Sequence, residues 1–221
     1  MNIVTALQVQ QRNKERVNVY LDGEYAFSLA LIEAAKLRKG QTLTEEDITQ
    51  LRDSDAIARA VDSAARFLAN RPRSVVEVRR NLSKKDTPEA VIDQAIARLE
   101  TMGYLDDTAF ARYWLENRNT FKPRGPMALR YELRQKGVAD DIIDAVLDDG
   151  LDVEAAAYKA AQQKASRLRG LTRQQFQNKL GGFLQRRGFT YATSRDVIEQ
   201  IATERCAEDP DFFVEPDSTD Y

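Results

Sequence analysis

The sequence predicts a mainly α-helical protein, a tandem repeat of three three-helix units preceded by a small antiparallel β meander. Over the first 30 residues, apolar and polar residues alternate, which is the spacing of half-buried strands. From about residue 41 to residue 206, apolar residues recur every three or four positions, the spacing of amphipathic helices. Within this helical region, matching residues lie 51 positions apart, which indicates a repeat. A length of 221 residues is sufficient for this architecture.

The N-terminal region, residues 1–43, is predicted to contain three strands and one short helix. The alternating segments lie near residues 3–9, 17–21 and 25–29. Asp22-Gly23 separates the last two segments and predicts a hairpin, because glycine adopts a positive φ without steric cost. The short helix is expected over Leu31 to Lys36.

The repeat divides the helical region into residues 44–103, which include a lead-in helix, residues 104–151 and residues 152–206. Apolar and basic residues match in all three units, at Val78/Leu129/Leu180, Leu82/Leu133/Leu184 and Lys85/Lys136/Arg187. The first two units also share Pro72/Pro123, Arg73/Arg124 and Arg79/Arg130. Each unit later carries two β-branched residues and an acid, at Val91-Ile92-Asp93, Ile142-Ile143-Asp144 and Val197-Ile198-Glu199. A period near 50 residues with three helices is typical of a helical solenoid.

Nine repeat helices are expected near residues 56–70, 74–85, 87–102, 106–121, 126–136, 139–149, 153–168, 172–187 and 193–206. Capping boxes are predicted at Thr44–Asp47, Ser74–Glu77 and Thr172–Gln175. Thr87, Asp106 and Asp140 are predicted N-caps, with Pro88 as a first helical residue. Gly103, Gly137 and Gly188 are placed where helices end.

The composition argues against an enzyme. The chain has no histidine and one cysteine, Cys206, which excludes the common Ser-His and Cys-His nucleophile pairs and a thiolate zinc site. It contains neither a P-loop nor a GxGxxG motif. The acid pairs, such as Asp106-Asp107, are adjacent in sequence, so their side chains do not face each other on a helix. We therefore expect no catalytic residue, no cofactor and no metal.

The net charge of −2 conceals strongly charged segments. Residues 52–138 carry 17 basic and 12 acidic residues, and residues 157–206 carry 10 and 3. Residues 139–156 hold seven acids and no base, and residues 207–221 hold six acids and no base. The proline-containing acidic tail, 207–221, is predicted to be disordered.

Basic residues that recur at repeat positions are the candidate binding residues. Arginine pairs well with carboxylate or phosphate. Two alternatives stay open: cations in a last helical turn interact with the helix dipole without any partner, and the others can be solvated surface charge. The candidates are Arg71, Arg73, Arg79, Lys85, Arg118, Lys122, Arg124, Arg130, Arg134, Lys136 and Arg187.

Several of these residues also carry a resemblance to the RecX family. The matching stretches are Arg71-Pro72-Arg73-Ser74-Val75-Val76-Glu77-Val78-Arg79, Gly103-Tyr104-Leu105-Asp106-Asp107 with Phe110-Ala111, Pro123-Arg124-Gly125, and Glu132-Leu133-Arg134-Gln135-Lys136-Gly137-Val138. The resemblance extends from about residue 55 to residue 200, and the N-terminal meander resembles an extension that some members carry. The third unit has no Pro-Arg step and departs most from the pattern.

The resemblance implies a non-enzymatic regulator of RecA that acts in DNA repair, recombination and the SOS response. Family members bind the RecA nucleoprotein filament and typically inhibit its ATPase, strand-exchange and co-protease activities, and some bind single- or double-stranded DNA. We expect a cytoplasmic protein, because no signal peptide or membrane-spanning run is evident. We also expect it to be a monomer. A stand-alone DNA-binding repeat module is the main alternative, and a scaffold repeat protein with another partner is the second.

Overall fold

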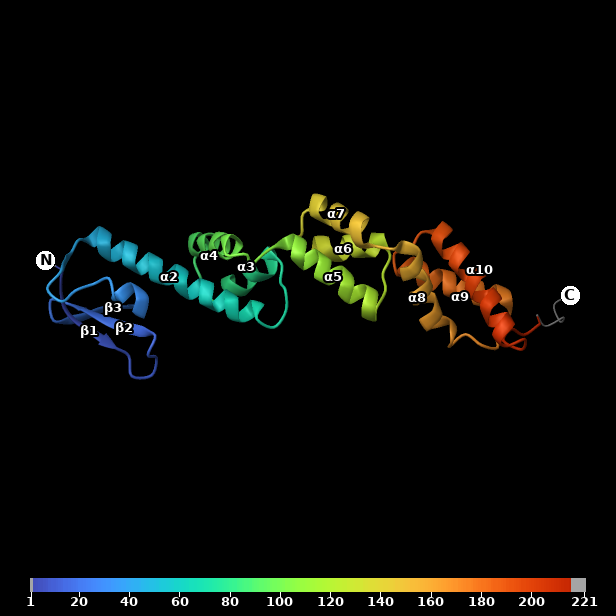
Figure 1. The fold of residues 1–221 in the computed structure, drawn as a ribbon, viewed down its shortest axis with the longest axis horizontal. Helices are drawn as coiled ribbons and strands as arrows, with labels where there is room; N and C mark the ends of the chain where they lie inside the picture. The colour runs from blue at the N-terminus through green and yellow to red at the C-terminus, as the bar shows by residue number, and fades with distance from the viewer. Residues whose placement is uncertain (1, 216–221) are drawn as a thin grey trace. The chain divides into compact units, whose positions relative to one another are not determined.

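The structure is a computed structural model that describes residues 2–215 (Figure 1). It contains two compact units, Met1–Leu105 and Asp106–Tyr221, each described here by itself. The first unit contains a β-sheet and one three-helix repeat, and the second contains two three-helix repeats. The predicted fold class, a mainly helical chain of three three-helix units behind an antiparallel sheet, is confirmed.

The N-terminal sheet has four strands in the order β3-β2-β1-β4, so the expected count of three strands is wrong. Its strands are β1 (Asn2–Val9), β2 (Arg16–Leu21), β3 (Glu24–Ala30) and β4 (Thr42–Leu43). The short helix α1 (Leu31–Ala34) lies between β3 and β4 in the chain. The additional strand, β4, pairs antiparallel with the start of β1. Two residues are too few to show an alternating pattern, which is why the sequence did not reveal this strand. Asp22 and Gly23 form the tight turn with φ of 51° and 93°.

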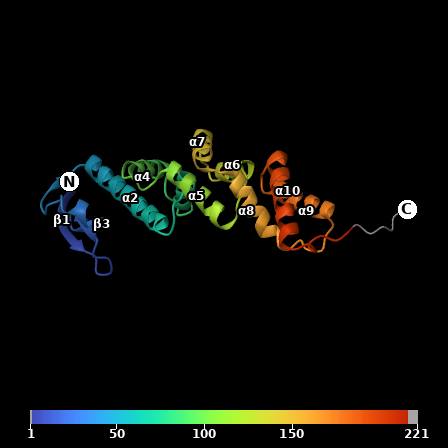
Figure 2. The same ribbon diagram turned by 45° about the vertical axis from the view of Figure 1, so that its right-hand side comes forward.

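A single long helix, α2 (Glu45–Leu68), belongs to both the sheet region and the first repeat (Figure 2). The sequence predicts a capped helix start at Thr44 and a separate helix over residues 56–70. The structure instead has one continuous helix of 24 residues. The predicted capping box is present: Thr44 Oγ1 accepts from the Asp47 N–H, and the Asp47 carboxylate accepts from the Thr44 N–H. Near its start α2 contributes Ile48 to the core of the sheet, and later Ala60 and Ala64 to the core of the repeat.

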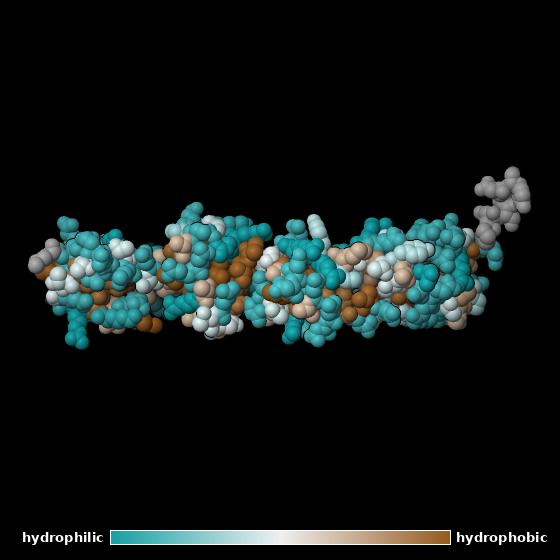
Figure 3. Space-filling model, turned by 90° about the horizontal axis from the view of Figure 1, so that it is seen from above, coloured by the Kyte–Doolittle hydropathy of each residue, from teal (hydrophilic) through white to brown (hydrophobic). Residues whose placement is uncertain are grey.

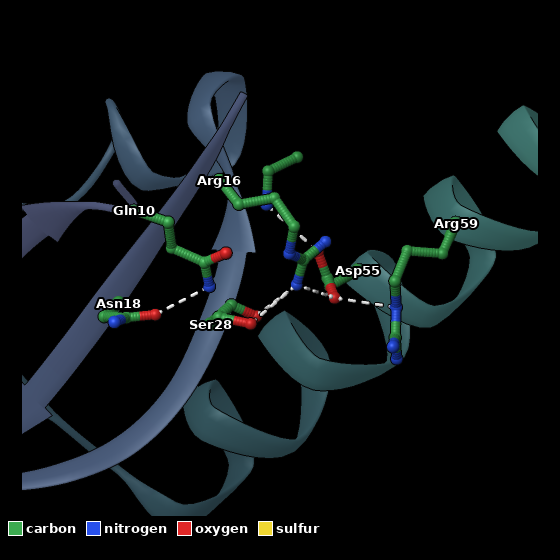
Figure 4. A network of polar contacts seen from close by, with 7 residues as sticks. Gln10, Arg16, Asn18, Ser28, Asp55 and Arg59 are labelled. Atoms are coloured by element: carbon green, nitrogen blue, oxygen red, sulfur yellow. Dashed lines mark hydrogen bonds and ion pairs between the residues drawn. The ribbon is translucent and has the colours of Figure 1, made fainter. Parts of the chain in front are cut away.

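A buried ion pair connects α2 to the sheet (Figure 4). The Asp55 carboxylate, 4% exposed, accepts from Arg16 at 3.0 and 2.9 Å and from the Ala30 N–H at 3.0 Å. Arg59 approaches the same carboxylate at 3.1 Å from the next turn of α2. Arg16 also donates to the Ser28 carbonyl and hydroxyl oxygens. This network therefore joins two strands and α2 through one carboxylate.

The repeat helices lie close to the predicted ranges. They are α3 (Val75–Ser83) and α4 (Glu89–Thr101) in the first unit, and α5 (Asp107–Phe121), α6 (Pro126–Gln135), α7 (Asp140–Gly150), α8 (Val153–Ala165), α9 (Arg173–Arg186) and α10 (Tyr191–Glu208) in the second. The six apolar residues that match at the 51-residue spacing are all fully buried. The periodicity therefore identified the core of each repeat.

Two predicted N-caps are wrong, and of the predicted box at Ser74–Glu77 the structure gives the Ser74 half. Ser74 and Asp106 accept backbone N–H bonds as expected, and Thr172 with Gln175 forms the predicted box. The N-cap of α4 is Pro88 instead of Thr87, and no side chain caps it. The N-cap of α7 is Ala139, without a side-chain cap, and the Asp140 carboxylate accepts from Arg134 at 2.6 Å instead of capping the helix. Gly103, Gly137 and Gly188 end helices with positive φ, as predicted.

The acidic C-terminal segment is structured for most of its length, so the prediction of disorder is wrong for residues 207–215. Phe212 is 5% exposed, and its ring lies edge-on to those of Phe176 and Phe213. The backbone returns alongside the loop before α9: Gly170 donates to Phe212, and Val214 donates to Leu171. Burial of two aromatic rings outweighs the charge of the neighbouring acids. Residues 216–221 of the predicted disordered tail lie outside the described residues.

The two repeats of the second unit are joined by backbone contact. Gly125 N–H donates to the Arg187 carbonyl at 2.8 Å, and a Cβ on Gly125 would lie 2.2 Å from the Gly188 carbonyl oxygen. A Cβ on Gly188, where φ is +87°, would lie 2.4 Å from the Ala128 nitrogen. Only glycine fits at either position, so the loop before α6 and the end of α9 are held in direct contact.

Candidate partner-binding surface

On the face shown in Figure 3, hydrophilic residues predominate, and hydrophobic residues appear in separate patches. The contacts of the candidate cations decide which of them have charge to offer a partner.

Two of the repeat arginines are already paired with carboxylates of their own repeat. An arginine of the second helix contacts the acid that follows the β-branched pair on the third helix, and the third repeat has an analogous pair. The pairs are Arg79–Asp93 at 2.6 Å, Arg130–Asp144 at 2.9 Å and Arg173–Glu199 at 2.5 Å. Arg79 also pairs with Glu89. The recurring acid therefore has a structural role, which is to hold the second and third helices together at the surface.

Four further candidates also make contacts within their own unit. Both terminal nitrogens of Arg71 lie 3.1 Å from the Glu77 carboxylate. Arg134 lies 2.6 Å from Asp140, and its hydrogen bond lowers the pKa of that carboxyl from its ordinary value. The Lys85 ammonium donates to the Ser63 hydroxyl at 2.6 Å, and the Arg73 guanidinium lies 4.0 Å from the centroid of the Phe67 ring. These contacts favour a structural role for the four side chains.

A different arrangement surrounds Trp114 in the second repeat, where several cations share one carboxylate. Arg118 Nε and Trp114 Nε1 donate to Glu132 Oε2 at 2.7 and 2.8 Å, and Arg124 Nε lies 3.4 Å from Glu132 Oε1. The Arg118 guanidinium lies 4.4 Å and the Lys136 ammonium 5.0 Å from the centroid of the Trp114 ring. We call these five residues the Trp114 cluster.

Arg187, from the end of α9, extends the Trp114 cluster. Its Nη1 donates to the Pro123 carbonyl at 3.1 Å, and its guanidinium lies 4.8 Å from the centroid of the Phe183 ring. Burial lowers the pKa of Arg187 from its ordinary value, and repulsion by Arg124 lowers it further. Within the described part of the chain, Arg187 makes no ion pair. The charge of Arg187 is therefore uncompensated.

Lys122 is also available, since its side chain is exposed at the C-cap of α5 and makes no hydrogen bond or ion pair with the residues that the structure describes. The structure thus brings together Arg118, Arg124, Lys136 and Arg187 on elements of the second and third repeats. It places Arg79, Arg130 and Arg134 in separate ion pairs instead.

The centre of the Trp114 cluster was not found from the sequence. Trp114 has the pattern of a core aromatic, and Glu132 that of an ordinary acid on a helix surface. The one available signal is the spacing of Trp114 and Arg118, which are four residues apart and so lie on one face of α5. Glu132 belongs to the next helix, and no local pattern indicates that it faces Trp114.

Basic side chains outnumber the single carboxylate in the Trp114 cluster. Among residues 2–215, no group of three or more potential ligand residues could hold a metal ion. No helix in that range is long and apolar enough to cross a membrane. The three three-helix repeats define a helical-repeat protein. The comparisons with known proteins identify the family.

Four family models match the chain in succession. They are the regulatory protein RecX N-terminal domain at residues 2–44, and the RecX first, second and third three-helix domains at residues 60–99, 106–147 and 152–198. The chain belongs to the RecX family of regulatory proteins, which are not enzymes.

Curated relatives support this assignment over nearly the whole chain. The regulatory protein RecX of Lactobacillus delbrueckii subsp. bulgaricus is 34% identical over 208 residues, which cover 92% of this chain and 76% of the relative. The regulatory protein RecX of Bacillus subtilis (strain 168) is 32% identical over 208 residues, which cover 92% and 79%.

Two solved structures have a similar fold. A crystal structure of regulatory protein RecX aligns with a TM-score of 0.73 and 25% identity, covering 90% of this chain and all of the other. The crystal structure of RecX from Lactobacillus salivarius aligns with a TM-score of 0.61 and 23% identity, covering 68% of this chain and 99% of the other. The second alignment shows likeness of fold alone.

Proposed function

We propose that this chain binds the RecA nucleoprotein filament and inhibits its ATPase, strand-exchange and co-protease activities, in the cytoplasm, during DNA repair and the SOS response. Its membership of the RecX family supports a regulatory role. The observation that carries the proposed contact is the Trp114 cluster with Arg187, where cations exceed the single carboxylate of Glu132. An acidic surface of a filament protomer would supply the missing negative charge.

Inhibition requires that the protein bind one state of the filament more tightly than another. A ligand shifts a conformational equilibrium only by its differential affinity for the two states. We therefore expect the Trp114 cluster to contact a surface whose position changes when the filament changes its nucleotide state. Tight binding without such discrimination would leave the ATPase activity unchanged.

The direct test is the ATPase rate of RecA filaments assembled on single-stranded DNA, with and without the protein. The expected result is a fall in the rate at amounts stoichiometric with RecA. Unchanged ATPase and strand-exchange rates at these amounts would contradict the proposed function.

Charge reversal tests the proposed surface. Lys122→Glu combined with Arg124→Glu is expected to weaken filament binding at least tenfold, since it removes two cations and adds two acids beside Glu132. Lys122 has no partner to lose, and loss of Arg124 relieves its repulsion of Arg187. The melting temperature, measured by circular dichroism, checks that the variant is folded.

The matched control is Arg130→Glu combined with Arg134→Glu, which also reverses two charges in the second repeat, both of them in ion pairs. Because Arg130 is paired with Asp144 and Arg134 with Asp140, we expect a smaller effect, about threefold or less. Equal losses in the two variants would indicate a general charge effect in place of a local surface.

The second candidate function is DNA binding without RecA, since the same excess of cations suits phosphate. This function predicts measurable affinity for single- or double-stranded DNA alone. The affinity would fall steeply with salt concentration, in proportion to the number of phosphates that are neutralised.

A further inference from the structure

The third repeat contains a groove that the sequence analysis did not reveal. It lies between α9 and α10 and has a volume of about 400 Å³. Gly181 and Gly182 line it, together with Gln174, Gln177, Asn178 and Tyr191. Tyr191 is 71% exposed.

Comparison of the repeats explains why the groove is open. At the 51-residue spacing, Gly181 occupies the position of Arg79 and Arg130. Those two arginines extend to the third helix of their repeats, where they pair with Asp93 and Asp144. In the third repeat the corresponding acid, Glu199, is bound from the first residue of α9, and the side chain opposite Gly181 is missing.

The packing within the repeat does not require these glycines. A Cβ on Gly181 would meet Ile198 Cδ1 at 3.6 Å, an ordinary contact, and one on Gly182 would meet the flexible end of Arg186 at 3.3 Å. Glycine is the least favourable residue in a helix interior apart from proline. Two consecutive glycines in the middle of α9 therefore reduce helix stability without an internal reason, unlike Gly125 and Gly188, where no side chain fits.

We propose that this groove receives an extended polypeptide segment of the protein partner, which, on the proposed function, is a RecA protomer. The glycines allow another backbone to approach α9 closely. A carboxamide can both donate and accept hydrogen bonds, as a peptide group does. Gln174 Nε2 already donates to Asn178 Oδ1 at 3.2 Å and Gln177 Nε2 to Glu199 Oε2 at 3.4 Å, so a bound segment would use the remaining donors and acceptors or replace these bonds. The flat exposed ring of Tyr191 offers apolar contact at the edge, and tyrosine is common at the centre of protein interfaces.

The charges of the groove favour a polypeptide over a nucleic acid. Its arginine, Arg195, lies 2.9 Å from Asp196, and its acid, Glu199, lies 2.5 Å from Arg173. The groove therefore lacks the excess of cations that a phosphate backbone requires. This feature distinguishes it from the Trp114 cluster, where cations exceed acids.

Gly181→Arg is the variant that tests the proposal, because the first two repeats accommodate an arginine at this position. The new side chain would extend toward Glu199 and fill the groove. We expect binding to assembled RecA filaments to weaken at least tenfold, with no fall in melting temperature. Gly181→Ala adds only a Cβ, which fills less of the groove but still hinders a close backbone, so we expect it to weaken filament binding by less than Gly181→Arg does.

A second variant tests the groove without changing the backbone. Asn178→Ala combined with Gln185→Ala removes two carboxamides from the lining and is expected to weaken filament binding severalfold. Filament binding by this variant at the wild-type level would overturn the proposal even if Gly181→Arg failed to fold.

The outcomes separate this proposal from the proposed function. If the wild-type chain does not bind the filament, both are overturned. If wild type and Gly181→Arg bind equally well, only the groove proposal is overturned. A Gly181→Arg defect confined to single-stranded DNA alone would identify a nucleic acid as the occupant and overturn the proposal. If the wild-type chain self-associates in size-exclusion chromatography and Gly181→Arg does not, the occupant is a second copy of this chain. That result would also overturn the proposal.

Discussion

Asp55 is the residue whose contacts most directly join different parts of the first unit. Its carboxylate accepts from two nitrogens of Arg16 and from the Ala30 N–H, and its side chain is 4% exposed. Asp55→Ala would leave the Arg16 guanidinium, 18% exposed, without its carboxylate. We expect the free energy of unfolding, measured with urea, to fall by about 3 kcal/mol. Asp53→Ala, an exposed acid on the same helix, should change it by less than about 0.5 kcal/mol.

The capping carboxylate of Asp47 makes stability depend on pH in the acid range. Hydrogen bonds from the Thr44 backbone and side chain lower the pKa of Asp47. A carboxyl group with a lower pKa in the folded state stabilises the fold above its unfolded pKa, and this contribution is lost as the pH falls through the folded pKa. Asp47→Asn should therefore destabilise the chain at neutral pH and have little effect once the pH lies below the folded pKa of Asp47. An equal loss of unfolding free energy at neutral pH and at low pH would show that the charge of Asp47 is not involved.

Residue patterns identified the candidate cations but not their partners. Arg79 and Arg130 were recognised as repeated positions, and so were Asp93 and Asp144 as repeated acids. Their pairing depends on how the second and third helices cross, which a periodic pattern along one helix does not encode. For this reason the sequence overestimated the number of cations available to a partner.

The contact between the loop before α6 and the end of α9 determines how the second and third repeats join. A Cβ on Gly125 would lie 2.2 Å from backbone oxygen, which cannot move without shifting the end of α9. Gly125→Ala should therefore lower the free energy of unfolding by about 2 kcal/mol or more, measured by urea denaturation. Gly181→Ala, whose Cβ meets only Ile198 at 3.6 Å, should raise it by up to about 1 kcal/mol. Tolerance of Gly125→Ala would show that the two repeats can separate without cost.

The returning C-terminal segment contributes to the core of the third repeat. Phe212→Ala removes a ring that is 5% exposed and lies against Phe176. We expect a loss of about 3 kcal/mol in the free energy of unfolding. Val214→Ala, 48% exposed in the same segment, should change it by less than about 0.5 kcal/mol, and equal effects would show that the segment is not anchored by Phe212.

This segment also shows how composition can mislead at the level of an element. Six acids and two prolines among residues 207–221 predicted disorder for the whole tail. Composition averages over the segment, whereas order depends on whether Phe212 and Phe213 can reach Phe176. The loop over residues 166–172 holds the segment in place through backbone hydrogen bonds with Phe212 and Val214. No local sequence pattern predicts this contact.

For the whole molecule, the fold was more predictable from the sequence than the binding surface. The spacing of Leu82, Leu133 and Leu184 follows from burial, which every repeat must satisfy in the same way. The Trp114 cluster and the groove at Gly181 instead arise from differences between repeats. A repeat pattern reports what the units share, so it does not reveal the features that distinguish one unit from another.

The continuity of α2 has a consequence for how the sequence of the first unit can vary in length. Ile48 faces the sheet core and Ala60 the repeat core, on one uninterrupted helix. An α-helix turns by about 100° for each residue. Inserting one residue between these positions would rotate the sheet about the helix axis by that angle. Either the apolar face around Ile48 or the one around Ala60 would then be exposed to solvent. Only insertions that restore the helical phase, close to whole turns, would keep both faces buried.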